Sequence, residues 1–264
     1  MTILSDLFKD PTRTAKTRAT GLTHVMDKGM SLVEINSLFE VAEEYVDIVK
    51  LGWCTSVVVQ NLERKIALFR GLPVALCCGG SLFELALAQG KVRELVSFFK
   101  EFNFKLVEVS DGVVDYPRKE KLRYIEMLAK DFTVLSEVGK KDRRQTMHAP
   151  SQWIVQMQED LSAGAWKVIA EGRESGTIGL FNEDGSIQTA LVEEIASKID
   201  FNHIIFEAPQ KEQQVWMVRH FGANVNLGNI APNDVISLET IRQKMRGDTM
   251  VQTINTKRRR PKAA

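Results

Sequence analysis

The sequence predicts an α/β protein folded as a single (β/α)8 TIM barrel. Three observations favour this fold: a length of 264 residues, eight short apolar runs, and amphipathic segments that alternate with those runs. One (β/α)8 barrel takes roughly 250 residues. Eight strand–helix units with short connections favour a closed barrel over an open doubly wound sheet. No Gly-x-Gly-x-x-Gly motif follows the first apolar run, which weakens a dinucleotide-binding alternative.

The eight apolar runs are expected strands. They are rich in Val, Ile and Leu and mostly lack strict alternation with polar residues, which is typical of parallel strands covered on both faces. The expected strands are Leu22–Met26, Val46–Leu51, Pro73–Cys78, Leu106–Val109, Thr133–Val138, Lys167–Ala170, His203–Phe206 and Asn224–Leu227.

The segments between the strands are expected helices, because their apolar residues recur at spacings of three and four. In the second of them, Gly90 interrupts the pattern and predicts a break or a kink. Ser31, Ser81, Ser151 and Asn233 precede such patterns and are expected N-caps. The expected helices are Leu32–Glu44, Leu82–Phe102, Leu122–Lys130, Trp153–Leu161, Ala190–Lys198 and Gln213–Phe221.

The chain shows no linker rich in Pro, Gly or Ser, so we expect one folded domain. A polar N-terminal extension, residues 1–17, precedes the barrel at residues 18–250. Residues 251–264 form a basic tail that we expect to be disordered, with a basic docking arm as the alternative. The formal net charge of +1 indicates neither a nucleic-acid nor a membrane partner.

The three cysteines, Cys54, Cys77 and Cys78, are too few and too odd in number for a disulfide framework. Cys77 and Cys78 lie in an apolar run and are expected to be buried thiols in a reducing compartment. The N-terminus lacks a secretory signal pattern, and no apolar run approaches the ~20 residues that span a bilayer. These features predict a cytoplasmic protein, and we also expect a homo-oligomer.

Polar and charged residues gather where the expected strands end. In a (β/α)8 barrel these ends converge on one face, where active sites lie. Buried charges are costly unless they are paired, so a set drawn from eight segments favours a functional site, although a structural salt bridge is nearly as good an interpretation of any single residue. The set comprises Asp27, Lys28, Lys50, Gly79, Gly80, Glu108, Ser110, Asp111, Glu137, Lys140, Lys141, Glu171, Arg173, Glu174, Glu207, Gln210, Asn226 and Asn229.

Five carboxylates at these ends could hold a divalent cation: Glu108, Asp111, Glu137, Glu171 and Glu207. Oxygen ligands favour Mg2+ over zinc. The four histidines show no ligand spacing and are expected to be incidental.

Five cations near the same ends, Arg18, Lys50, Lys140, Lys141 and Arg173, indicate an anionic substrate.

Two segments are candidate phosphate sites. The loops after the last two strands often bind phosphate in such barrels, and here they carry Gln210 and Gly228-Asn229-Ile230. Gly228 would let backbone N–H groups approach a phosphate. The second candidate is Gly79-Gly80 before a helix, for which a plain tight turn is an equal alternative.

Nine runs spread over residues 18–249 resemble the phosphosulfolactate synthase family, and EVGKK, EGRESG and VNLGNI are specific in combination. The chain departs from the family at Cys54, where a Gly is expected, and at Ser81, where Thr is common; neither change removes a charge. The runs are GLTHVMDKG, VKLGWCTS, GGSLFE, VEVSDG, LSEVGKKD, EGRESG, FEAPQKEQQ, NVNLGNI and RGDT.

The resemblance implies a lyase that uses Mg2+ to add sulfite to phosphoenolpyruvate, giving (2R)-O-phospho-3-sulfolactate, an early intermediate of coenzyme M synthesis. Lys140 or Lys141 would protonate C2, and Glu137 would bind metal or orient the lysine. The expected substrate-binding residues are Arg18, Lys50, Arg173, Gln210, Gly228, Asn229 and Ser110, and the expected metal ligands are Glu171, Glu207, Glu108 and Asp111.

Two alternatives stay open. The same barrel could act on another phosphorylated enol or with another nucleophile. The chain could also be a non-catalytic, stress-related member of the family, although such a protein has no need of the charged residues at the strand ends.

Overall fold

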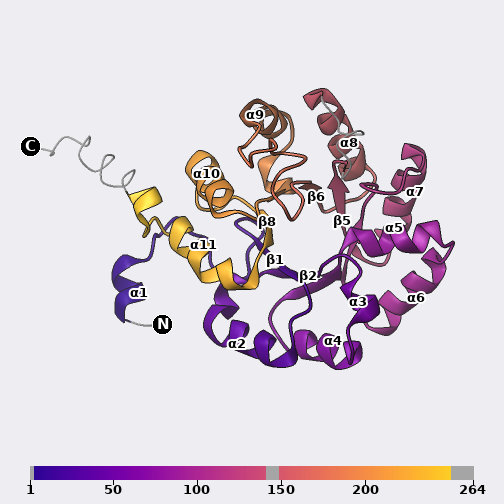
Figure 1. Ribbon diagram of the computed structural model, residues 1–264, viewed down its shortest axis with the longest axis horizontal. Coiled ribbons are helices and arrows are strands. Elements are labelled where there is room, and N and C mark those ends of the chain that lie inside the picture. The colour runs from indigo at the N-terminus through magenta and orange to yellow at the C-terminus, as the bar shows by residue number, and fades with distance from the viewer. Residues whose placement is uncertain (1–2, 141–148, 251–264) are drawn as a thin grey trace, which may run out of the picture.

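The computed structural model describes residues 3–140 and 149–250, in which eight parallel strands form one sheet inside a ring of helices (Figure 1). The strands are β1 (Thr23–Asp27), β2 (Ile48–Leu51), β3 (Ala75–Cys78), β4 (Leu106–Val109), β5 (Thr133–Val138), β6 (Lys167–Ala170), β7 (Ile204–Glu207) and β8 (Leu227–Ile230).

The strand order is β3-β2-β1-β8-β7-β6-β5-β4. The first and last strands of the chain, β1 and β8, therefore pair with each other, and β3 and β4 at the two ends of this order pack side by side. This arrangement closes the sheet around its axis and confirms the predicted (β/α)8 barrel.

Helices follow the strands and cover the outside of the barrel, while α1 stands away from the ring near the described C-terminal end (Figure 1). The helices are α1 (Ile3–Phe8), α2 (Leu32–Ala42), α3 (Thr55–Val58), α4 (Leu62–Arg70), α5 (Gly80–Ala88), α6 (Val92–Glu101), α7 (Arg118–Leu128), α8 (Pro150–Ser162), α9 (Thr189–Lys198), α10 (Lys211–Phe221) and α11 (Val235–Arg242), with 3-10 turns at Glu43–Tyr45, Phe201–His203 and Pro232–Asp234.

The helix boundaries follow local chemistry in some places and tertiary contacts in others. Ser31 caps α2, as predicted, and also forms a capping box with Glu34. The expected long helix is interrupted at Gly90, which has a φ of 67° and lies between α5 and α6. Ser81 and Ser151 lie inside the helices that they were expected to cap. Asn233 lies in a 3-10 turn.

The eighth strand begins three residues later than predicted. The side chain of Asn226 accepts a hydrogen bond from the Leu22 N–H at 3.0 Å and donates one to the Ile204 carbonyl at 2.9 Å. These bonds tie the segment before the strand to its two neighbours, so the ladder itself starts at Leu227.

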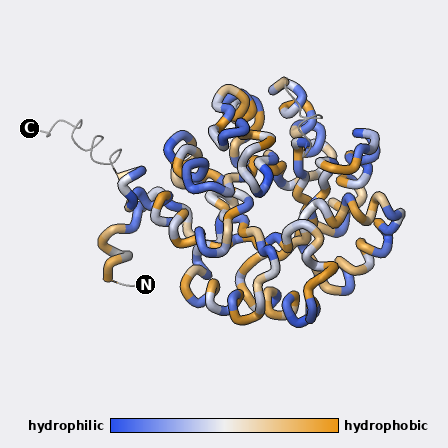
Figure 2. Tube along the Cα trace, viewed as in Figure 1, coloured by the Kyte–Doolittle hydropathy of each residue, from blue (hydrophilic) through white to orange (hydrophobic). Residues whose placement is uncertain are grey.

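Apolar residues form two layers. The larger layer lies between the strands and the helices, whose residues alternate between hydrophilic and hydrophobic along the chain (Figure 2). The smaller layer fills the barrel interior and comprises Leu22, Ile48, Cys77, Leu106, Leu135, Ile169 and Ile205. Successive residues of a strand point to opposite faces, so the residue two positions further along each strand also faces the interior, one step closer to the carboxyl end.

Candidate active site

A cavity of about 180 Å3 opens at the carboxyl ends of the strands. Its volume is below the roughly 300–1,000 Å3 of pockets for drug-sized ligands, which suits a small substrate. Seven of the residues that were predicted to be catalytic, to bind substrate or to bind metal line it. The lining residues are Met26, Lys50, Trp53, Gly79, Gly80, Ser81, Glu108, Val113, Glu137, Glu171, Arg173, Glu174, Glu207 and Asn229.

The acidic floor of this cavity follows from a pattern shared by four consecutive strands. In each of β4, β5, β6 and β7, an inward-facing Leu or Ile of the interior layer is followed two residues later by a glutamate. The alternation of strand side chains turns all four glutamates inward at the same end. They are Glu108, Glu137, Glu171 and Glu207, all buried.

Lys50 lies among these carboxylates with only 4% of its surface exposed. Its Nζ is 3.1 Å from Glu207 Oε1 and 3.6 Å from Glu108 Oε2. Burial alone would lower the pKa of Lys50, but the carboxylates of Glu108, Glu207 and Glu137 outweigh it and raise the pKa above its usual range. Lys50 therefore carries a fixed positive charge at the cavity.

Glu108 has a strongly shifted pKa. Its Oε1 accepts a hydrogen bond from the Gly80 N–H at 2.6 Å. Burial and the neighbouring Glu137 raise the pKa of Glu108 to about 7, against the opposing effect of Lys50. Because the Gly80 N–H already donates to Glu108, it is not available to donate a hydrogen bond to a phosphate in the cavity.

Glu137 belongs to a buried network that the sequence did not reveal. Ser110 Oγ lies 2.8 Å from an oxygen of Glu137 and 2.8 Å from an oxygen of Glu84. Glu84, on α5, also accepts hydrogen bonds from the N–H groups of Gly112, Val113 and Val114, at 3.2, 2.7 and 2.6 Å. Glu84 thus fixes the loop after β4. It lies in the GGSLFE run, which contributes to the family resemblance and contains the candidate phosphate site Gly79-Gly80, but Glu84 itself was not among the predicted site residues.

The loop after β4 in turn holds two predicted residues away from the cavity floor. The carboxylate of Asp111 pairs with Lys121 at 2.7 Å, and Asp111 does not line the cavity. Lys140 Nζ donates to the Asp111 carbonyl at 2.9 Å and lies 3.8 Å from Asp115. Asp111 is therefore engaged as a loop anchor, not placed as a metal ligand. Lys141 lies outside the described residues.

The segment after β6 brings Arg173 to the cavity in a left-handed conformation with a φ of 51°. Its N–H donates to the Glu171 carboxylate, and the Gly172 N–H donates to Glu207 Oε2 at 3.0 Å. The chain then turns back so closely that a Cβ on Gly179 would lie 1.9 Å from the Glu171 carbonyl oxygen.

The candidate phosphate site after β7 and β8 is only partly assembled at the cavity. Asn229 lines the cavity, and its buried Oδ1 has no hydrogen-bond partner among the described residues. Gly228 lies in the strand beside His24. Gln210 is instead the N-cap of α10 and donates to the Ser175 carbonyl at 2.7 Å, outside the cavity lining.

Arg18 does not join the site, contrary to its predicted role. Its Nε pairs with Asp47 at 3.1 Å, and its guanidinium also donates to the Glu44 carbonyl. Asp47 immediately precedes β2, so Arg18 lies at the amino end of the barrel, where it lines a separate hollow of about 490 Å3. The expectation failed because residues just before the first strand approach the barrel from its amino end.

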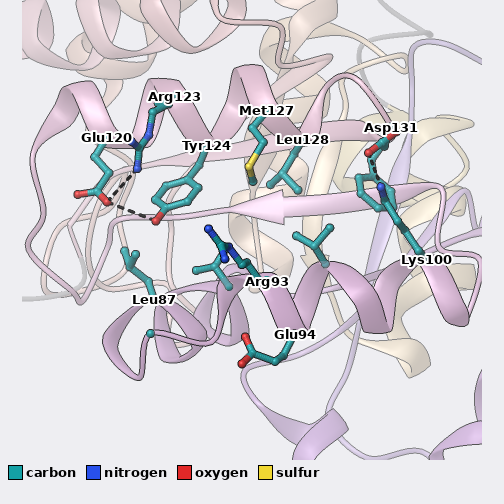
Figure 3. A pocket seen from close by; sticks show the side chains of 14 residues that line it. Leu87, Arg93, Glu94, Lys100, Glu120, Arg123, Tyr124, Met127, Leu128 and Asp131 are labelled. Carbon is teal, nitrogen blue, oxygen red and sulfur yellow. Dashed lines mark hydrogen bonds and ion pairs between the residues drawn. The ribbon is translucent and has the colours of Figure 1, made fainter.

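A larger hollow of about 1,100 Å3 lies on the outside of the barrel between α6 and α7 (Figure 3). Its charged side chains are mostly paired with each other, as in Lys100 with Asp131 at 2.7 Å and Arg123 with Glu120 at 3.6 Å. The strand ends do not reach it, so its size does not make it the catalytic site.

The sequence matches the family model described as (2R)-phospho-3-sulfolactate synthase (ComA) over residues 11–248. The chain belongs to the phosphosulfolactate synthase family. It is 40% identical to the phosphosulfolactate synthase of Methanothermobacter thermautotrophicus over 92% of this chain and 96% of that protein. It is also 40% identical to the phosphosulfolactate synthase of Bacillus subtilis, over 90% of this chain and 96% of that protein. The protein is therefore an enzyme of the lyase class expected from its sequence.

Solved structures with low sequence identity share the barrel. The YdjI aldolase from Escherichia coli K12 superposes with a TM-score of 0.55 at 10% identity, covering 91% of each chain. The 3-hexulose-6-phosphate synthase from Salmonella typhimurium gives a TM-score of 0.54 at 13% identity, over 87% of this chain and 98% of that one. At such identities the likeness shows the fold alone.

Within the described ranges, no helix has both the length and the apolar character that crossing a membrane would require.

Proposed function

We propose that this enzyme adds sulfite to phosphoenolpyruvate to give (2R)-O-phospho-3-sulfolactate, with Mg2+ as the cofactor. The observation that carries the proposal is the small cavity at the strand ends, in which Lys50 and Arg173 lie among inward-facing carboxylates. Family membership supports the same reaction.

The donor set suits Mg2+, which prefers oxygen ligands and usually keeps only one or two carboxylates beside substrate oxygens and water. Glu171 and Glu207 are the residues that we propose to hold it. Both line the cavity, whereas Asp111 is paired with Lys121 outside the cavity lining. The lining residues carry five carboxylates but only two cationic groups, so a trianionic substrate needs added positive charge.

In the proposed reaction, the sulfite sulfur forms a bond to the CH2 carbon of phosphoenolpyruvate. The π electrons move toward C2 and the carboxylate, and a proton then adds to C2. Mg2+ would act as a Lewis acid on that carboxylate. Lys50 supplies fixed positive charge at the cavity floor, and Arg173 faces the substrate from the loop after β6. Preorganised charge of this kind stabilises an anionic transition state.

Lys140 remains the residue that we propose as the proton donor. Its ammonium is tethered to the loop after β4, which also contributes Val113 to the cavity lining. Lys140→Ala should reduce kcat by roughly 10²–10⁴-fold, the usual contribution of a general acid. Lys119→Ala is a matched control, because Lys119 is exposed on the following helix. Near-full turnover in Lys140→Ala would remove Lys140 from this role.

The function is tested by mixing the protein with phosphoenolpyruvate, sulfite and Mg2+ and following substrate and product by NMR. We expect phosphosulfolactate to form and turnover to stop with EDTA. A folded protein that binds phosphoenolpyruvate without forming this product would favour another nucleophile or another enol. A protein that does not bind phosphoenolpyruvate at all would favour the non-catalytic alternative.

We further propose that the enzyme works in a reducing, cytoplasmic setting, because the adjacent Cys77 and Cys78 are buried free thiols.

A further inference from the structure

The barrel interior beneath the cavity holds a group of potential ligands of mixed chemistry. His24 of β1, Cys77 of β3 and Glu108 of β4 each offer one ligand atom, and these three atoms lie within 4.8 Å of one another. All three side chains are buried, His24 and Cys77 completely. We propose that this group binds one thiophilic divalent cation of the zinc class, through one nitrogen, one sulfur and one oxygen.

His24 is the observation that first points to a ligand. Both of its ring nitrogens are buried, and neither has a hydrogen-bond partner among the described residues. Leaving a buried polar atom unsatisfied costs about 1–3 kcal/mol, so an imidazole in this position is expected to have a partner. Burial and the nearby Lys50 hold the pKa of His24 well below its usual value. The imidazole is therefore neutral, which is the form that binds metal ions.

Glu108 can contribute an oxygen while keeping its hydrogen bond to the Gly80 N–H. Its Oε1 is bound to the Gly80 N–H, whereas its buried Oε2 makes no hydrogen bond to a described residue and lies 3.6 Å from Lys50 Nζ. Lys50 keeps the closer carboxylate of Glu207 at 3.1 Å. An ion that takes Glu108 Oε2 therefore leaves Lys50 paired.

Cys77 sets the class of ion. Thiolate and imidazole ligands favour Zn2+ over Mg2+, whose preferred ligands are oxygens. Burial and Glu108 raise the pKa of the Cys77 thiol, so the ion must displace the thiol proton: the S–H bond breaks, the metal–sulfur bond forms, and the proton leaves to solvent. No oxidation or reduction is involved.

The separations of the ligand atoms are close to those of a zinc site. Zn–S bonds of about 2.3 Å and Zn–N bonds of about 2.0–2.1 Å place tetrahedral ligand atoms roughly 3.3–3.7 Å apart. The three ligand atoms lie within 4.8 Å of one another, and small side-chain rotations would bring them to that separation. Three protein ligands leave a fourth position, as in zinc sites that are open to a small ligand, and Glu108 connects the site to the cavity floor.

The adjacent cysteine provides a matched control. Cys77 belongs to the apolar layer inside the barrel, whereas Cys78 belongs to the layer between strands and helices. Both thiols are buried, and a Ser in place of either makes the same chemical change. Only Cys77→Ser should affect the proposed site.

The test is Co2+ titration of chelator-treated full-length protein in the presence of excess Mg2+. We expect one Co2+ per chain, tetrahedral visible bands and a near-ultraviolet thiolate-to-cobalt band. Cys78→Ser should retain all three, whereas Cys77→Ser should lose the thiolate band and bind Co2+ at least about 10-fold more weakly. Circular dichroism would check that each variant is folded.

A wild-type protein that binds no Co2+ under these conditions would overturn the proposal, as would a Cys77→Ser protein that keeps the thiolate band. If the Cys77 variant does not fold, X-ray absorption of the zinc-loaded wild type decides: one sulfur and one imidazole in the zinc shell support the site, and a shell of oxygens alone refutes it. These readouts need no turnover, so the site can fail or hold independently of the proposed reaction.

Discussion

The contacts of Glu84 allow a sharp prediction about the loop after β4. Glu84 is 2% exposed, and its carboxylate accepts hydrogen bonds from the Ser110 hydroxyl and three consecutive backbone N–H groups. Glu84→Gln keeps the shape but removes the charge and one acceptor. Hydrogen bonds to charged groups contribute about 1.5–3 kcal/mol and neutral ones about 0.5–1.5. The two ranges differ by about 1–1.5 kcal/mol per bond, so over the three backbone bonds we expect the variant to lose about 3–4.5 kcal/mol of unfolding free energy.

Two measurements test this prediction. Urea unfolding followed by circular dichroism gives the loss of stability, and hydrogen exchange reports the amides of Val113 and Val114, which both bond to Glu84 Oε2. These two amides should exchange faster in Glu84→Gln. Glu101→Gln is the control, because Glu101 is exposed at the end of α6 and its substitution should change stability by no more than about 0.5 kcal/mol. Equal stability of the two variants, with unchanged exchange at both amides, would refute the anchoring role.

Three further predictions follow from the geometry. Gly179 and Gly90 have φ values of 70° and 67°, but only a Cβ on Gly179 would meet a backbone atom, at 1.9 Å. Gly90→Ala should therefore lower the unfolding free energy by about 1 kcal/mol, and Gly179→Ala should lower it clearly more. Thermal unfolding measures both, and equal losses of stability would contradict the clash. Burial lowers the pKa of Lys167 to about 8, so between about pH 8 and pH 10.5 the unfolded chain binds more protons than the folded chain. The stability of the wild type should therefore rise with pH in this range relative to that of Lys167→Met. If the Tm of the wild type instead falls relative to that of the variant, the sign is wrong. Arg18→Met should lower Tm without changing KM for phosphoenolpyruvate, whereas Arg173→Met should raise KM; a KM effect of Arg18 would return it to the active site.

The fold could be predicted from sequence because its signal repeats. Seven of the eight strands lie within two residues of their predicted starts, since buried parallel strands are short apolar runs bounded by polar residues. The eighth was displaced because Asn226 bonds through its side chain to both neighbouring strands. A long-range contact of this kind has no local signature. The short helix α3 (Thr55–Val58) and the following α4 also had no expected range.

The acidic floor of the site was predictable for a related reason. The recurrence of an apolar residue, any residue and a glutamate in four consecutive strands places four carboxylates at one end of the barrel. The sequence does not show which partner each charged side chain pairs with. Glu137 lies in β5 and lines the cavity, whereas Asp111 lies just after β4 and does not. Asp111 pairs instead with Lys121, a buried cation that α7 supplies.

His24 shows the limit of predicting metal ligands from their spacing in the sequence, because no histidine of this chain has such a spacing. Spacing rules describe ligands that come from one loop or one helix. In a barrel, side chains from different strands meet in the interior, so His24, Cys77 and Glu108 are far apart in the chain but adjacent in space. The same geometry gives the enzyme two chemically distinct levels. Carboxylates and cations line the cavity at the mouth, and beneath it a ring nitrogen of His24, the sulfur of Cys77 and an oxygen of Glu108 lie together. Because Glu108 belongs to this group and also lines the cavity, a cation bound below would change the charge at the cavity.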